Sequence, residues 1–85
     1  MNPPIDIKKY QHYLQQYVDQ AFQNSDGTVR GLQDYLESIQ VKGIFVRDKV
    51  EKQRALADAI QAFTEHRHWP LDIILSHLGV SRPGQ

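Results

Sequence analysis

Cysteine is absent from this sequence of 85 residues. Its absence excludes a disulfide framework, a zinc site with thiolate ligands and a cysteine nucleophile. Long hydrophobic runs are missing as well: no stretch approaches the roughly 18 to 20 apolar residues of a membrane span, and the first residues lack the basic and apolar segments of a secretion signal. We therefore expect a cytoplasmic protein that does not enter a membrane.

An excess of charge of one sign is also lacking, because ten Lys and Arg residues balance ten Asp and Glu residues. Zero net charge argues against a strong non-specific nucleic-acid binder, since such proteins neutralise many phosphates. A local basic patch nevertheless lies between residues 42 and 54, and it comprises Lys42, Arg47, Lys49, Lys52 and Arg54. It is either the solvated start of a helix with internal ion pairs or a nucleic-acid site.

Motifs of nucleotide-binding and catalytic sites are missing. The five glycines are scattered, and neither G-x-x-x-x-G-K-[ST] nor G-x-G-x-x-G occurs. His66 and His68 are two residues apart, which on a helix turns their rings about 200° from each other and makes shared metal ligation poor. Ser76 and His77 are neighbours that face different ways on a helix, so they cannot form a triad with Asp72. We expect no enzyme, no cofactor and no metal.

What the sequence does contain is enough for one folded domain. Hydrophobic residues make up 40% and charged residues 24%, a mix typical of globular proteins and unlike that of disordered chains. A chain of this length buries only about 60–65% of its unfolded surface, which leaves nothing for a second core. We expect a single domain over residues 1–85, with residues 1–5 and 81–85 frayed.

Apolar residues recur at steps of three and four, the period of amphipathic α-helices, in four segments. These segments cover residues 7–23, 28–40, 48–66 and 70–78. Asp6 and Thr28 are suited to be the N-caps of the first two helices, and Gly79 suits the left-handed position after the fourth. The pattern therefore predicts an all-α fold, a compact bundle of about four helices.

The third helix carries two further predictions. Its apolar face is expected to comprise Val50, Leu56, Ala57, Ile60, Phe63 and Thr64. Asp48 and Glu51 have the spacing of a capping box, in which the first accepts from the third helical N–H and the second reaches back. Just before this helix, residues 41–47 include Ile-Phe-Val, which favours a strand although no second strand is evident. We expect a buried connector there, with a short extended segment as the alternative.

Two surfaces are candidates for binding another macromolecule. The first, predicted to lie opposite the apolar face of the third helix, is the strip of Ala55, Ala59 and Ala62. Small side chains would let another helix approach closely, although alanine is also simply the best helix former on a surface. The second surface comprises Trp69 and Ile73 with Arg67 beside them, because aromatic and arginine side chains often anchor interfaces. The alternative is that Trp69 folds back and closes the end of the bundle.

Tyr10, Tyr13 and Tyr17 recur at helical spacing, which raises the question of stacking on unpaired bases. Tyr10 and Tyr17 lie within the apolar stripe of the first helix, and Tyr13 lies at its edge. The pattern therefore favours core tyrosines whose hydroxyl groups reach water.

The segment Leu-Ser-His-Leu-Gly-Val-Ser-Arg-Pro at residues 75–83 resembles the first helix and turn of bacterial helix-turn-helix proteins. In that family the turn leads into a recognition helix that lies in the major groove. No recognition helix follows within this sequence, so the resemblance does not imply that this chain reads DNA.

We therefore expect a non-catalytic helical module that binds another protein or a larger complex, as a small accessory subunit, adaptor or inhibitor. The alternative is a nucleic-acid-binding regulatory protein that uses the basic residues between 42 and 54. Self-association into a homodimer through exposed apolar strips is compatible with either function.

Overall fold

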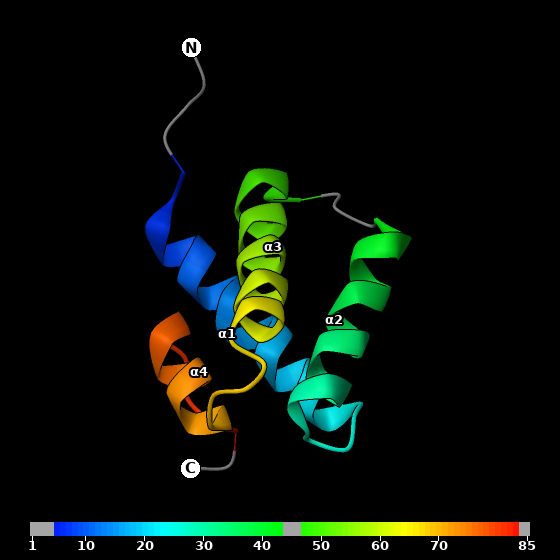
Figure 1. Ribbon diagram of the computed structural model, residues 1–85. Helices are drawn as coiled ribbons and strands as arrows, with labels where there is room; N and C mark the ends of the chain where they lie inside the picture. Colours follow the sequence, from blue (N-terminus) through cyan, green and yellow to red (C-terminus); the bar gives the residue numbers. More distant parts are fainter. Residues whose placement is uncertain (1–4, 44–46, 84–85) are drawn as a thin grey trace.

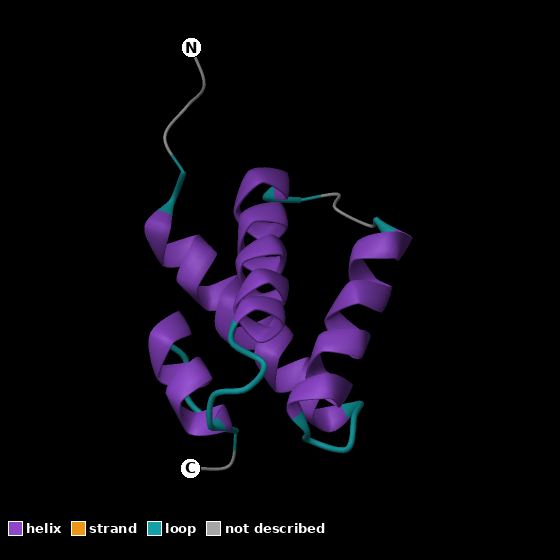
Figure 2. Cartoon of the chain, viewed as in Figure 1, coloured by secondary structure: helices purple, strands orange, loops and turns teal. Residues whose placement is uncertain are grey.

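Four α-helices form the described part of the computed structural model, which covers residues 5–43 and 47–83. They are α1 (Ile7–Gln23), α2 (Val29–Lys42), α3 (Lys49–Glu65) and α4 (Leu71–Leu78). Helices α1 and α2 diverge from the turn that joins them, α3 lies across both, and α4 packs against α3 (Figure 1). Within the described ranges the remaining residues form loops and turns without a strand (Figure 2). The predicted all-α bundle of about four helices is confirmed.

The helix ends follow the local signals of the sequence. The Asp6 carboxylate accepts from two backbone N–H groups in the first turn of α1, at 3.1 and 3.2 Å. The Thr28 hydroxyl accepts from the N–H of Gly31 at 3.0 Å at the start of α2. After α4, Gly79 has a φ of 75°, and the N–H of Val80 reaches back into the helix at 3.0 Å. These three predicted caps are confirmed.

The start of α3 differs from the predicted capping box. Asp48 has a left-handed backbone, with φ 54° and ψ 46°, and its side chain makes no capping bond. A capping residue normally has an extended backbone, which aims its side chain at the first turn. The Asp48 carboxylate instead accepts from the Lys9 ammonium at 3.2 Å and from the Tyr13 hydroxyl, and Glu51 accepts from the Asp6 N–H at 3.3 Å. The capping-box prediction is wrong, and both carboxylates tie α3 to α1.

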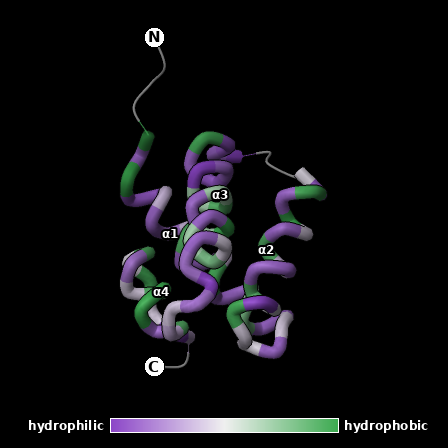
Figure 3. Tube along the Cα trace, in the orientation of Figure 1, coloured by the Kyte–Doolittle hydropathy of each residue, from purple (hydrophilic) through white to green (hydrophobic). Residues whose placement is uncertain are grey.

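One cluster of buried apolar side chains is shared by all four helices. Its members are Leu14, Val18, Ala21, Leu32, Leu36, Ala55, Leu56, Ala59, Ala62, Phe63, Ile74 and Leu75. Hydrophobic and hydrophilic residues alternate along each helix, as an amphipathic pattern requires (Figure 3). The apolar stripes predicted for the other helices comprise Ile7, Tyr10, Leu14, Tyr17, Val18, Ala21 and Phe22 on α1, Val29, Leu32, Tyr35, Leu36 and Ile39 on α2, and Leu71, Ile74, Leu75 and Leu78 on α4. All of these residues lie in this cluster or against it except Ile7, which is 57% exposed.

Helix α3 is turned relative to the orientation predicted from its sequence. Its buried residues are Ala55, Leu56, Ala59, Ala62 and Phe63. Val50, Ala57 and Thr64, which the pattern assigns to the apolar face, are exposed, so the buried face is rotated by about one residue, or 100°. The reason is that α3 contacts all three other helices. The small alanine side chains let the backbones of those helices approach α3 closely. The prediction of the alanine strip as an outward docking surface is therefore wrong, because helices of this chain cover it.

The described residues of the segment 41–47, which are 41–43 and 47, are all exposed, so for them the predicted buried connector is wrong. Val41 and Lys42 complete the last turn of α2, and Val41 is 87% exposed. Gly43 ends the helix in the left-handed conformation, with a φ of 63°. Residues 44–46, which hold the Ile-Phe-Val sequence, lie outside the described residues. The predicted alternative of a short extended segment falls on these residues.

Part of the C-terminal segment is held against the bundle. Ser81 donates its N–H to the Gln15 side chain at 3.0 Å and accepts from the same side chain at 2.9 Å. Arg82 forms an ion pair with Asp72 at 2.8 Å. These contacts differ from the expectation of a frayed tail at these two residues, because α1 and α4 supply polar groups that the local sequence does not reveal.

Candidate functional site

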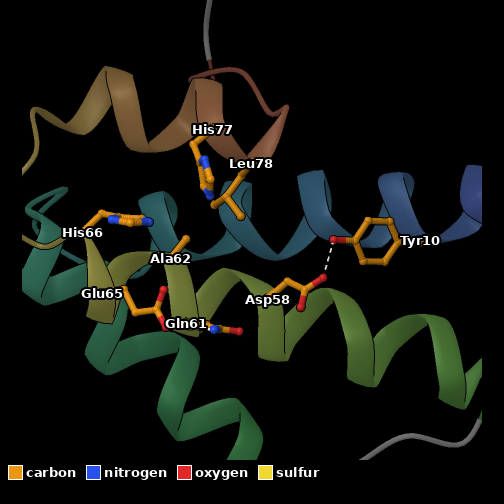
Figure 4. A pocket seen from close by; sticks show the side chains of 8 residues that line it. All are labelled: Tyr10, Asp58, Gln61, Ala62, Glu65, His66, His77 and Leu78. Carbon is orange, nitrogen blue, oxygen red and sulfur yellow. Dashed lines mark hydrogen bonds between the residues drawn. The ribbon is translucent and has the colours of Figure 1, made fainter.

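A first hollow, of about 280 Å³, lies between α1, α3 and α4 (Figure 4). It is lined by Tyr10, Asp58, Gln61, Ala62, Glu65, His66, His77 and Leu78, and we call it the histidine pocket. Figure 4 shows His77 descending from α4 toward the side where His66 follows the end of α3. Polar side chains of three helices therefore converge here.

The two histidines of this pocket belong to an aromatic cluster with Trp69. The His66 ring stacks on the Trp69 indole with centroids 3.7 Å apart and planes 9° apart. His77 meets His66 edge-on at 5.1 Å and Trp69 at 5.7 Å. The cluster holds α4 to the end of α3, so of the two predictions for Trp69 the structure shows the one in which it closes the end of the bundle.

At the other end of the histidine pocket, the Tyr10 hydroxyl donates to the Asp58 carboxylate at 2.6 Å. Burial and this bond raise the pKa of Tyr10 to about 12. The phenol therefore stays protonated at neutral pH and links α1 to α3. In the described ranges no three His, Cys, Asp or Glu side chains are placed together so that they could hold a metal ion.

A second hollow, of about 310 Å³, lies where α1 and α2 diverge. It is lined by Tyr13, Gln16, Tyr17, Gln20, Tyr35, Ile39, Lys42 and Lys52, and we call it the tyrosine groove. The first four of these residues come from α1, the next three from α2, and Lys52 from α3. The groove exists because α1 and α2 separate with distance from their shared turn (Figure 1).

The tyrosine groove is aromatic and positively charged. The Lys52 ammonium lies 5.2 Å from the centroid of the Tyr13 ring, which is within the range of a cation–π contact. The hydrogen bond to Asp48 raises the pKa of Tyr13, and burial raises the pKa of Tyr17, so both rings stay neutral. The residues that line the groove include two lysines and no carboxylate. In the described part of the chain, the ion pairs do not involve either lysine.

Comparison with protein-family models, curated proteins and solved structures found no match to this chain. None of the helices in residues 5–43 and 47–83 combines the length and the apolar character that crossing a membrane requires.

The structure divides the predicted basic patch. Lys42 and Lys52 meet at the tyrosine groove, whereas Lys49 lines a separate hollow against the end of α2, and Arg54 lines one beside the start of α1. Arg47 is exposed ahead of α3. Successive residues of a helix are turned by about 100°, so basic residues that are close in sequence point in different directions. The patch is not one continuous surface.

The second predicted docking surface is reduced in a similar way. Trp69 is half-buried in its stack with His66, so its ring is only partly available. Ile73 is 53% exposed, so it lies on the surface as predicted. Arg67 is exposed and donates weakly, at 3.4 Å, to the backbone carbonyl of Thr64.

Sequence reasoning missed the tyrosine groove as a unit. The spacing of Tyr13 and Tyr17 was a signal that two rings share one face of α1. The opposite wall, with Tyr35 and Lys42, comes from the next helix, and only the packing angle of α1 and α2 brings the two walls together.

Proposed function

We propose that this chain is a non-catalytic helical module that binds another protein, as an accessory subunit, adaptor or inhibitor of a larger complex in the cytoplasm. The tyrosine groove is its docking site. The observation that supports this proposal is the convergence of three half-buried tyrosines and two lysines, from three helices, on one hollow. Tyrosine offers a large contact area with a polar tip at a small cost in side-chain entropy, and it is enriched in protein interfaces.

A nucleic-acid partner is the weaker alternative. Proteins that bind nucleic acid mainly through charge neutralise several phosphates, about 6 to 10 in strongly salt-dependent cases. The tyrosine groove supplies two lysines, and the other basic residues of the predicted patch face elsewhere. The net charge of the chain is zero. These charges suit a limited number of ion pairs with a protein better than a phosphate backbone.

The proposal is tested by capturing partners from source cells with two matched variants. Gln16→Trp places a bulky uncharged side chain at an exposed lining position of the groove, and Gln53→Trp makes the same change at an exposed position of α3 outside it. Tryptophan has an intermediate helix propensity, and neither change alters the net charge. We expect the wild type and Gln53→Trp to recover a common protein after nuclease treatment and at high salt, and Gln16→Trp to lose it.

Two results would contradict the proposal. If the captured protein is no longer recovered after nuclease treatment, the chain binds nucleic acid and not that protein. A protein retained equally by both variants would place the docking site on another face, such as the one around Ile73.

A further inference from the structure

We infer that the tyrosine groove accepts an acidic amphipathic helix of a partner protein. One apolar or aromatic side chain of that helix sits among the tyrosines, and its carboxylates face Lys42 and Lys52. This inference rests on the proposed function and specifies the chemistry of the partner.

The shape of the groove favours a helix with a single anchor. Its volume of about 310 Å³ is at the lower end of the range for binding pockets, which suits one or two side chains and not a whole segment. Most of its lining residues come from α1 and α2, so the groove lies between two helices. Partner helices commonly lay an apolar face in a groove of this kind and insert anchor residues at helical spacing.

The walls of the groove favour an apolar or aromatic anchor. Three tyrosine rings and Ile39 surround the hollow, and the tyrosine rings lie partly against the buried core. Aromatic pairs at offset or edge-on geometry stabilise a contact beyond the effect of the buried area. A phenylalanine, tryptophan or leucine of the partner would therefore find complementary surface on several sides.

The charges of the groove favour carboxylates around the anchor. Lys52 is half-buried over the Tyr13 ring, and Lys42 is exposed at the end of α2. No carboxylate lines the groove, and the Asp48 carboxylate, which contacts Tyr13, already accepts from Tyr13 and Lys9. A basic helix would meet two like charges that nothing within the groove neutralises, whereas an acidic helix would pair with both.

The test combines peptide selection with matched charge reversals. A displayed library of helical peptides is selected on the wild-type chain, and selected peptides are titrated by fluorescence anisotropy. Lys42→Glu/Lys52→Glu reverses the groove lysines, and Lys8→Glu/Lys49→Glu makes the same net charge change at exposed lysines outside the groove. We expect selected peptides to carry Asp or Glu around one large apolar residue. The groove variant should weaken binding at least tenfold, and the control variant less than twofold.

A milder variant keeps the test possible if the charge-reversed variant does not fold. Lys42→Gln/Lys52→Gln removes both charges without adding repulsion, and we expect it to weaken binding by roughly half as much on a logarithmic scale. The helicity of all variants is checked by circular dichroism. If the charge-reversed variant fails to fold, the inference is tested with the neutral variant alone. A peptide affinity of that variant equal to that of the wild type would overturn the inference.

Other outcomes also overturn the inference. Selection of basic or neutral peptides, selection of none, or acidic peptides that bind the groove variant as tightly as wild type would each do so. Tighter, steeply salt-dependent binding of a labelled 20-residue oligothymidine would instead indicate single-stranded nucleic acid. A cellular partner lost by Gln16→Trp but retained by Lys42→Glu/Lys52→Glu would contradict the acidic helix and leave the proposed function standing.

Discussion

At the scale of single residues, two carboxylates serve as links between helices. Asp58 accepts from the Tyr10 hydroxyl, and Asp48 accepts from the Tyr13 hydroxyl and the Lys9 ammonium. The Tyr13 hydrogen bond and the Lys9 ammonium lower the pKa of Asp48. Both tyrosines keep their protons and the Asp48 carboxylate stays charged, so the bond from Tyr13 to Asp48 is a hydrogen bond to a charged group, the stronger kind.

Tyr10→Phe should change how stability depends on alkaline pH. The pKa of Tyr10 rises from its ordinary value of 10.0 to about 12 in the folded chain, so its contribution is fully present below pH 10 and is lost as pH rises through 12. We expect the variant to be less stable than wild type by about 0.5–1.5 kcal/mol at pH 8, and the difference to narrow by pH 11.5. Urea unfolding of both proteins at the two pH values measures this difference in stability. A difference that stays constant with pH would contradict the raised pKa of Tyr10.

At the scale of elements, α3 decides how the bundle packs. It contacts every other helix, and its alanines at positions 55, 59 and 62 allow close approach on the sides that face them. These side chains are buried although alanine is also common on helix surfaces. The residue type alone therefore does not show whether these alanines are buried or exposed, whereas the packing of the other helices around α3 does.

Enlarging a buried alanine of α3 should be costly, and enlarging an exposed one should not. Ala59 is fully buried and Ala57 is exposed on the same helix. We expect Ala59→Leu to destabilise the chain by about 1–3 kcal/mol through overpacking, and Ala57→Leu to change stability by less than about 0.5 kcal/mol. Urea unfolding followed by circular dichroism compares them. Equal stabilities would mean that α3 does not have the orientation described above.

At the scale of the whole molecule, one core joins four helices, and the histidine pocket and the tyrosine groove lie on its surface. The histidine pocket is bounded by α4 and by the stack of His66 on Trp69, so its side chains serve mainly to hold the bundle closed. The tyrosine groove is bounded by helices that diverge, so part of its aromatic surface stays exposed. The two hollows also differ in chemistry, because Asp58 and Glu65 line the histidine pocket whereas no carboxylate lines the tyrosine groove.

A shared core predicts a single cooperative unfolding transition. Trp69 fluorescence reports the junction of α3 and α4, whereas far-ultraviolet circular dichroism reports mostly the three longer helices. We expect both signals to give the same urea midpoint, as two-state unfolding requires. An earlier fluorescence transition would show that α4 separates from the remaining helices before they unfold.

Much of this fold is determined by the sequence alone. Helix positions follow from apolar periodicity, and helix ends follow from Asp6, Thr28 and Gly79, because a cap acts on backbone groups within a few residues of itself. The inner faces of α1, α2 and α4 are similarly clear, since each has one dominant apolar stripe.

Only the tertiary structure decided the features that depend on residues far apart in the chain. Alanine has no strong preference for core or surface, so the buried face of α3 was settled by the three helices packed around it. Asp48 pairs with residues of α1 and not with its own helix, which local spacing does not reveal. The tyrosine groove likewise needs the angle between α1 and α2. Local signals determine where helices begin and end, whereas packing determines which surfaces they leave for a partner.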